Sequence, residues 1–349
     1  MTTQRILWGP FLAAIVAVGT GCGGKYPAAR PASPAAPAAA KNKPAEEKKV
    51  KIDVEAAGMP FAIVRGHDGH AVTVDDFYAD LMTARAVCVG EEHSNPHAHW
   101  AQLQVLDQIT QRAQAANKPM AMGMEMFQRP FQGVLDDYAA GRIDEAAMLA
   151  RTGWKKRWGF DYALYRPLIR VAVERKAQIL ALNVSTELKK KFSKKGIDGL
   201  APADRAKLPE LNLDDAQHRA WWDLQMQDHP GGHDHGHGRG GPSKEDKAMF
   251  DRMYRVQVLW DETMADTAAG WLKGGDNRMI VILAGDGHCH DSAIVKRLAR
   301  RGVGKVLSVH PVIDTGDGEV SDLLAAPQND YLFVMTPPKS ADAAAGHDE

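Results

Sequence analysis

The chain has 349 residues, of which 44% are hydrophobic and 25% are charged, and its formal net charge is -1 at pH 7. A chain of this length can form one large globular domain or two smaller ones. The nearly neutral charge gives no basis for electrostatic binding of nucleic acid, so partners must be inferred from individual sites.

Residues 1–22 have the pattern of a secretory signal. Arg5 precedes an apolar run from Ile6 to Val18, which is shorter than the roughly 20 residues that a membrane span needs. Small residues then lead to Cys22, an arrangement that resembles the cleavage site of bacterial lipoproteins, in which the cysteine is acylated. Cleavage that leaves a free cysteine is the alternative, and we expect lipidation at Cys22.

Residues 23–49 are rich in Pro and Ala and then charged, with too little apolar content to fold. We interpret them as a linker that holds a domain off a membrane. Gly23 replaces the Asp that typically retains such proteins at the inner membrane, which favours an outer-membrane lipoprotein facing the periplasm. Residues 339–349 are polar and are predicted to be a disordered tail.

Residues 50–338 alternate short apolar runs with helical patterns, which predicts parallel βαβ units in one α/β domain. The runs are continuously apolar, as expected for strands covered on both faces. The predicted strands are residues 85–90, 119–127, 177–184, 278–285, 305–313 and 330–335.

A helix is predicted directly after the first of these strands. Asn95 is a suitable N-cap and Pro96 a suitable first helical residue, and Leu103, Leu106 and Ile109 fall on one face.

Residues 128–167 and 200–270 are mostly helical and do not fit simple alternation. We interpret them as a smaller helical cap over the carboxyl ends of a mainly parallel sheet flanked by helices. In open α/β sheets that edge binds ligands.

Two of the predicted strands end in similar motifs, Gly-Glu-Glu-His and Gly-Asp-Gly-His. Alternate residues of an extended segment face the same way, so Glu91 and His93 should share one side. Asp286, His288 and His290 should share a side for the same reason. If the strands are neighbours, carboxylates and imidazoles converge, as suits a divalent transition metal or acid–base catalysis.

Glu125, which ends the segment GMEMF, adds a carboxylate at the same edge, where burial requires a partner. The metal-ligand candidates are Glu91, His93, Glu125, Asp286, His288 and His290. The catalytic candidates, if the protein is an enzyme, are Glu91, His93, Glu125 and His288. Alternatively, each histidine is a structural hydrogen-bonding residue, and Glu125 pairs with an arginine.

Tyr254, Gln257 and Asp261 form a polar stripe on a predicted helix. The stripe either faces the site or is a solvated helix face.

The segment HPGGHDHGHGRGG is rich in histidine and glycine. Such tracts bind zinc, copper or nickel flexibly, so we interpret it as an accessory metal loop, with a neutral linker as the alternative. Its histidines are His229, His233, His235 and His237.

Cys88 and Cys289 lie beside the proposed site but point away from its histidines by strand parity. Burial as small apolar residues is the preferred interpretation, and a disulfide is the alternative if the strands adjoin in an oxidising compartment. The sequence has no Cys-x-x-Cys-His motif for covalent haem attachment, no phosphate loop, no Gly-x-Ser-x-Gly elbow and no His-Glu-x-x-His helix.

The segments VGEEH, GMEMF, LALNV, VQVLWDETMA and ILAGDGH together resemble the ChaN-like haem-binding lipoproteins over residues 85–313. That family belongs to a superfamily with the TraB and Tiki proteins and the erythromycin esterases. The resemblance implies a parallel α/β core with a helical subdomain, an outer-membrane anchor, haem binding and a role in iron acquisition. Its paired motifs fall on Gly90, Glu91 and His93 and on Gly285 and His288. Asn is usual in the family where this chain has Asp286.

Two hypotheses follow. The first is a carrier that captures haem or iron between the cap and the sheet edge through an axial His or Tyr. The resemblance implies that haem can be held by tyrosine at the interface of a homodimer. The carrier's cofactor-binding candidates are His93, His288, Tyr254, Gln257, Asp261 and Tyr165. The second is a metal-dependent hydrolase, protease- or esterase-like, in which the paired motifs hold a divalent ion and one carboxylate activates water.

Overall fold

The computed structural model describes residues 52–226 and 244–338. The predicted signal, Cys22, the linker, the histidine loop and the tail therefore lie outside the described residues. Among the described residues, no helix combines the length and apolar character needed to cross a bilayer.

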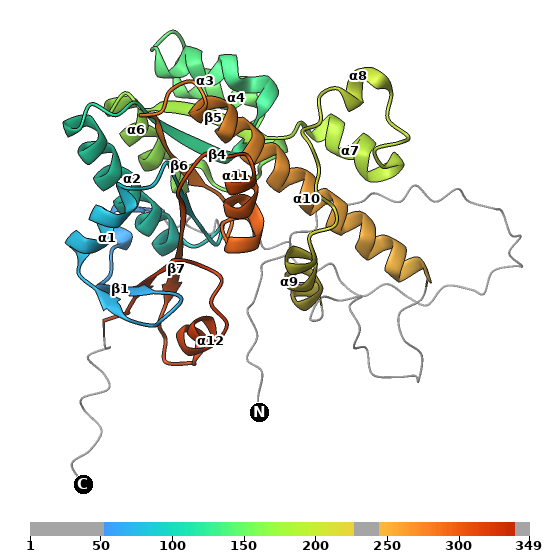
Figure 1. Ribbon diagram of the computed structural model, residues 1–349. Helices are drawn as coiled ribbons and strands as arrows, with labels where there is room; N and C mark the ends of the chain where they lie inside the picture. Colours follow the sequence, from blue (N-terminus) through green and yellow to red (C-terminus); the bar gives the residue numbers. More distant parts are fainter. Residues whose placement is uncertain (1–51, 227–243, 339–349) are drawn as a thin grey trace, which may run out of the picture. The chain divides into compact units, whose positions relative to one another are not determined.

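The described residues form one mixed eight-stranded sheet in the order β2-β1-β8-β7-β3-β6-β4-β5 (Figure 1). All pairs from β8 to β5 are parallel, and β1 pairs antiparallel with both β2 and β8. The strands are β1 (Phe61–Arg65), β2 (Ala71–Val72), β3 (Ala86–Val89), β4 (Met120–Gln128), β5 (Gln178–Asn183), β6 (Met279–Leu283), β7 (Val306–Ile313) and β8 (Tyr331–Met335).

Helices connect the strands and cover both faces of the sheet. They are α1 (Val74–Leu81), α2 (Pro96–Ala115), α3 (Gln132–Ala139), α4 (Glu145–Thr152), α5 (Trp154–Arg157), α6 (Arg166–Glu174), α7 (Thr186–Lys195), α8 (Pro202–Arg205), α9 (Ala216–Met226), α10 (Lys244–Leu272), α11 (Lys296–Arg300) and α12 (Glu319–Ala325). Short turns add η1 (Glu55–Ala57), η2 (Arg129–Phe131), η3 (Tyr162–Leu164) and η4 (Asp291–Val295).

The α/β class and the six predicted strands are confirmed. Continuous apolar runs marked these strands because both of their faces are buried. Two edge strands, β1 and β2, were missed: β2 has two residues, and β1 is largely exposed along its length. Short half-exposed strands carry little apolar signal.

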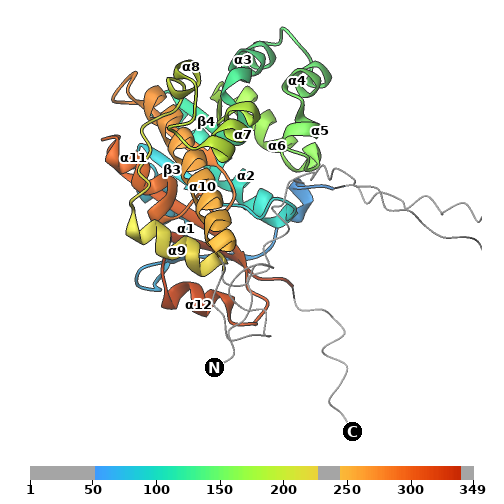
Figure 2. The same cartoon turned by 90° about the vertical axis from the view of Figure 1, so that its right-hand side faces the viewer.

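Strand parity divides the core into two layers. Val87 and Val89 of β3 pack with α2 and α6 on one face, whereas Ala86 and Cys88 pack with α10 and α11 on the other. Figure 1 shows α2 and α10 on opposite sides of the strands, and in Figure 2 α10 lies in front. Side chains from the two faces can therefore meet only beyond the ends of the strands.

The helix predicted after the first strand is confirmed as α2. The Asn95 side chain accepts hydrogen bonds from the backbone N–H groups of His97 and Ala98, and Pro96 is the first helical residue.

The two segments predicted as a cap contain different structures. Residues 128–167 hold η2, α3, α4, α5 and η3, and residues 200–270 hold α8, α9 and most of α10. The C-terminal half of α10 packs in the sheet core through Met264, Ala265, Ala268, Ala269 and Leu272. This long helix thus forms part of one covering layer and also carries polar residues to the edge of the sheet.

Candidate functional site

The two motifs meet at the carboxyl edge, because β3, β6 and β4 are neighbours in the sheet. The backbone N–H of Gly285, after β6, donates to Glu125 Oε2 of β4 at 2.8 Å. A Cβ atom at Gly285 would lie 2.9 Å from His93 Cε1 and 3.7 Å from Glu125 Oε2. Glycine is therefore required here by the close approach of the two motifs.

The first cluster, which we call the Glu91 group, consists of Glu91, His93, His99 and Tyr165 on the α2 side. Glu91 Oε1 lies 2.7 Å from His93 Nδ1 and accepts a 2.8 Å hydrogen bond from the Tyr165 hydroxyl. Glu91 Oε2 lies 3.3 Å from His99 Nδ1. Burial and the Glu91 charge raise the pKa of Tyr165 well above its usual value. The phenol is therefore a neutral donor.

Sequence reasoning missed His99, although a signal was present. His99, Leu103 and Leu106 have helical i, i+4, i+7 spacing, so the histidine belongs to the buried stripe of α2. A fully buried histidine on an apolar stripe needs polar partners, and the Glu91 group supplies them.

The second cluster, which we call the His288 group, consists of Glu125, His218, Asp261, His288 and Arg297 on the side of α10 and α11. His288 lies between two carboxylates, with Nδ1 2.5 Å from Asp261 Oδ1 and Nε2 3.4 Å from Glu125 Oε1. Asp261 Oδ2 lies 3.2 Å from His218 Nε2 and 3.6 Å from Arg297 Nη2. Nothing in the sequence indicated His218 or Arg297, because tertiary packing alone brings α9 and α11 here.

The charges of this group reinforce one another. Burial opposes a charged His288, but Glu125 and Asp261 outweigh it and raise the pKa of His288 to about 10. Burial alone would raise the pKa of Asp261 and of Glu125, yet the charges of Arg297 and His288 lower the first and that of His288 lowers the second. At neutral pH His288 is thus an imidazolium, which has no lone pair for a metal.

The polar stripe of α10 faces the protein interior. Tyr254, Gln257 and Asp261 are 3%, 6% and 0% exposed. Gln257 Nε2 donates to the carbonyl oxygen of Gly287 at 3.0 Å, and the Tyr254 hydroxyl lies 3.4 Å from His218 Nδ1.

The expectation that Asp286, His288 and His290 share one side is wrong. Residues after Gly285 form a tight turn, in which His288 N donates to Gly285 O at 2.8 Å, so strand parity does not apply. The Asp286 carboxylate is directed to β7, 2.9 Å from His310 Nδ1.

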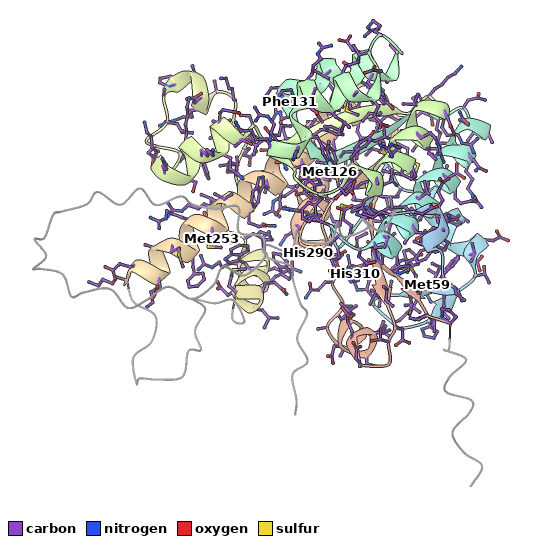
Figure 3. The ribbon with its side chains drawn as sticks, turned by 180° about the vertical axis from the view of Figure 1, so that it is seen from behind. Met59, Met126, Phe131, Met253, His290 and His310 are labelled. Carbon is purple, nitrogen blue, oxygen red and sulfur yellow. A yellow bond between two sulfur atoms is a disulfide. The ribbon has the colours of Figure 1, made fainter. Side chains whose placement is uncertain are left out.

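His290, which is labelled in Figure 3, lies beside His218 of the His288 group but forms no hydrogen bond to that group among the described residues. It is 3% exposed, and its ring centroid lies 4.1 Å from that of Trp221 and 6.1 Å from that of His218. Nδ1 contacts Ser292 Oγ at 3.2 Å, whereas Nε2 has no hydrogen-bond partner in the part of the chain that the structure describes. Burial lowers the pKa of His290 to about 3, so the ring is neutral.

The six metal-ligand candidates do not gather into one cluster in the described part of the chain. Within residues 52–226 and 244–338, no three His, Cys, Asp or Glu side chains are arranged to hold a metal ion. Glu91 and His93 pair in one group and Glu125 and His288 in the other. Asp286 pairs with His310, and His290 packs against Trp221 and His218.

Cys88 and Cys289 form a disulfide, with an S–S distance of 2.02 Å. The preferred interpretation, free buried thiols, is wrong because β3 and β6 are adjacent and bring the two residues together. The bond ties the turn between His288 and His290 to the central strand β3.

This fold and edge site define an α/β protein with a buried, ion-paired Glu–His network. Residues 77–298 match the family described as haem-binding uptake, Tiki superfamily, ChaN. Because the match spans more than half of the chain, the protein belongs to this family. No curated protein is similar enough to count as a match.

A solved haem-binding protein shares the fold. The chain is 17% identical to ChaN of Campylobacter jejuni, with a TM-score of 0.59 over 79% of this chain and 97% of that one. It is 13% identical to a mutant of the erythromycin esterase EreC in its open conformation, with a TM-score of 0.38 over 80% and 83% of the two chains.

Proposed function

We propose that this protein is a membrane-anchored lipoprotein that binds haem and serves iron acquisition. The observation that carries the proposal is the match of residues 77–298 to the haem-binding uptake family. The Campylobacter jejuni relative binds haem cofacially. The N-terminal signal and Cys22 support an outer-membrane anchor with the domain facing the periplasm.

Haem binding needs apolar surface and an iron ligand with an available lone pair. Helices α9 and α10 offer apolar surface, which we call the α9–α10 surface: Trp221, Leu224, Met226, Met249 and Met253. Leu224 is 55% exposed and Met249 is 36% exposed, so this surface is open to a planar apolar ligand. The histidine-rich segment joins these two helices in the sequence.

His290 fits the ligand role best. Its ring is neutral and lies against Trp221 of the α9–α10 surface, and its Nε2 is buried without a hydrogen-bond partner among the described residues, so iron binding requires the side chains over it to move. A neutral imidazole nitrogen is a common ligand of haem iron. Bound haem would supply the iron centre, while this chain supplies the ligand and the apolar contact.

The haem-ligand candidates from the sequence fit less well. His288 has both ring nitrogens directed to carboxylates, and the hydroxyl of Tyr165 is bonded to Glu91. Burial raises the pKa of Tyr254 to about 12, which opposes the phenolate that ferric iron binds. In this proposal the Glu91 and His288 groups stabilise the fold and do not ligate the haem iron.

The test is a haemin absorption titration of the full-length chain carrying Cys22→Ala and Asn at the four loop histidines. We expect a saturable Soret shift, an affinity at least tenfold lower for His290→Ala, and little change for Tyr254→Phe as the matched control. Circular dichroism verifies that each variant is folded.

A flat titration of folded protein would overturn haem binding. Equal affinities for His290→Ala and the parent chain would overturn the assignment of His290 as the iron ligand, but not haem binding itself.

The proposal includes a homodimer whose interface covers Leu224 and Met249. Sedimentation with and without haemin measures the oligomeric state.

A further inference from the structure

A basic hollow lies between the end of α7 and α10, helices that lie side by side (Figure 1). Its volume is about 220 Å³, below the roughly 300–1,000 Å³ of pockets for drug-sized ligands. It is lined by Phe192, Ser193, Lys194, Lys195, Gly196, Arg252 and Arg255. No acidic side chain lines it.

The four cations of the hollow, Lys194, Lys195, Arg252 and Arg255, form no ion pair within the described residues. Nearby cations do: Lys191 Nζ lies 2.6 Å from Asp204 Oδ2, and Arg219 Nη1 lies 2.8 Å from Asp251 Oδ1. All four side chains are exposed, so water and salt screen their mutual repulsion, and it is their convergence on one hollow that favours an anionic ligand.

Helix stability explains only half of this cluster. Lys194 and Lys195 occupy the last turn of α7, where cations favour the helix dipole. Arg252 and Arg255 are in the interior of α10, far from its C-terminus at Leu272, so the dipole does not account for them. Their i, i+3 spacing puts both guanidinium groups on one face of the helix.

We propose that this hollow binds a phosphate-bearing anion. Guanidinium groups bind phosphate oxygens through paired hydrogen bonds, and lysines add positive charge. The Ser193 hydroxyl, which also lines the hollow, is a further hydrogen-bond donor. The phosphate comes either from a lipid headgroup or from a small soluble phosphate, because both present the same oxygens. This site shares no residue with the proposed haem site and does not depend on it.

The experiment is isothermal titration calorimetry of the full-length Cys22→Ala chain with two probes, inorganic pyrophosphate and dihexanoyl phosphatidylglycerol below its micelle concentration. Two double variants test the hollow: Lys194→Gln with Lys195→Gln, and Arg252→Gln with Arg255→Gln. The matched control is Lys155→Gln with Lys156→Gln on α5, which removes the same charge from exposed lysines outside the hollow.

We expect saturable binding that each hollow variant weakens about tenfold and the control changes less than twofold, as loss of exposed charge-assisted hydrogen bonds predicts. Tighter binding of the lipid identifies a headgroup, and tighter binding of pyrophosphate identifies a soluble phosphate. Absence of binding to both probes would overturn the proposal. So would equal weakening by the control, since binding would then follow net charge alone.

Discussion

The Glu91 group and the His288 group are built on similar motifs, but they differ in how many carboxylates contact the histidine of the motif. In the first, one carboxylate serves two imidazoles and a phenol. In the second, two carboxylates enclose one imidazole, and Arg297 supports Asp261. The motif places a histidine at the sheet edge in both groups. Burial opposes the charged form of each, but Glu91 outweighs it and raises the pKa of His93, and two carboxylates, Glu125 and Asp261, raise that of His288 to about 10.

Removing the central carboxylate of each group gives the sharpest contrast. Asp261→Asn should lower the free energy of unfolding by about 3–5 kcal/mol, because buried Arg297 and His288 lose their shared counter-ion. Glu91→Gln should cost only about 1–3 kcal/mol, since an amide oxygen still accepts from Tyr165. Urea denaturation measures both, and a larger loss for Glu91→Gln would contradict the contrast.

The disulfide should stabilise the His288 side in particular. Cys88→Ala with Cys289→Ala should lower the free energy of unfolding by about 2–5 kcal/mol, because the bond closes a long loop of the unfolded chain. Amide exchange should then quicken in the turn at residues 285–291 more than at the start of α2. Uniform exchange changes would show that the bond does not hold that turn specifically.

Alkaline pH should weaken the His288 group by a smaller amount. Folding raises the pKa of His288 from about 6.5 to about 10, so its contribution is complete below about pH 6.5 and is lost as the pH rises to 10. The stability of the parent chain should fall relative to that of His288→Gln across this window. If the free energies of unfolding of the two proteins changed with pH in parallel, His288 would not have the raised pKa.

Sequence patterns predicted the parallel strands, helix α2 and the meeting of Glu91, His93, Glu125 and His288 at one edge, because periodicity and edge position are local properties. They could not predict the direction of Asp286, since parity ends where a turn begins. Nor could they predict Arg297 beside Asp261, because that contact depends on how α11 packs against α10.

The central claim is that His288 is a structural cation, whereas His290, two residues away, is neutral and able to bind iron. Nitrogen-15 NMR of the histidine rings in the labelled full-length protein at pH 7 tests it directly. The account predicts two protonated ring nitrogens for His288 and one for His290, consistent with pKa values of about 10 and about 3. A neutral His288 or a doubly protonated His290 at pH 7 would contradict it.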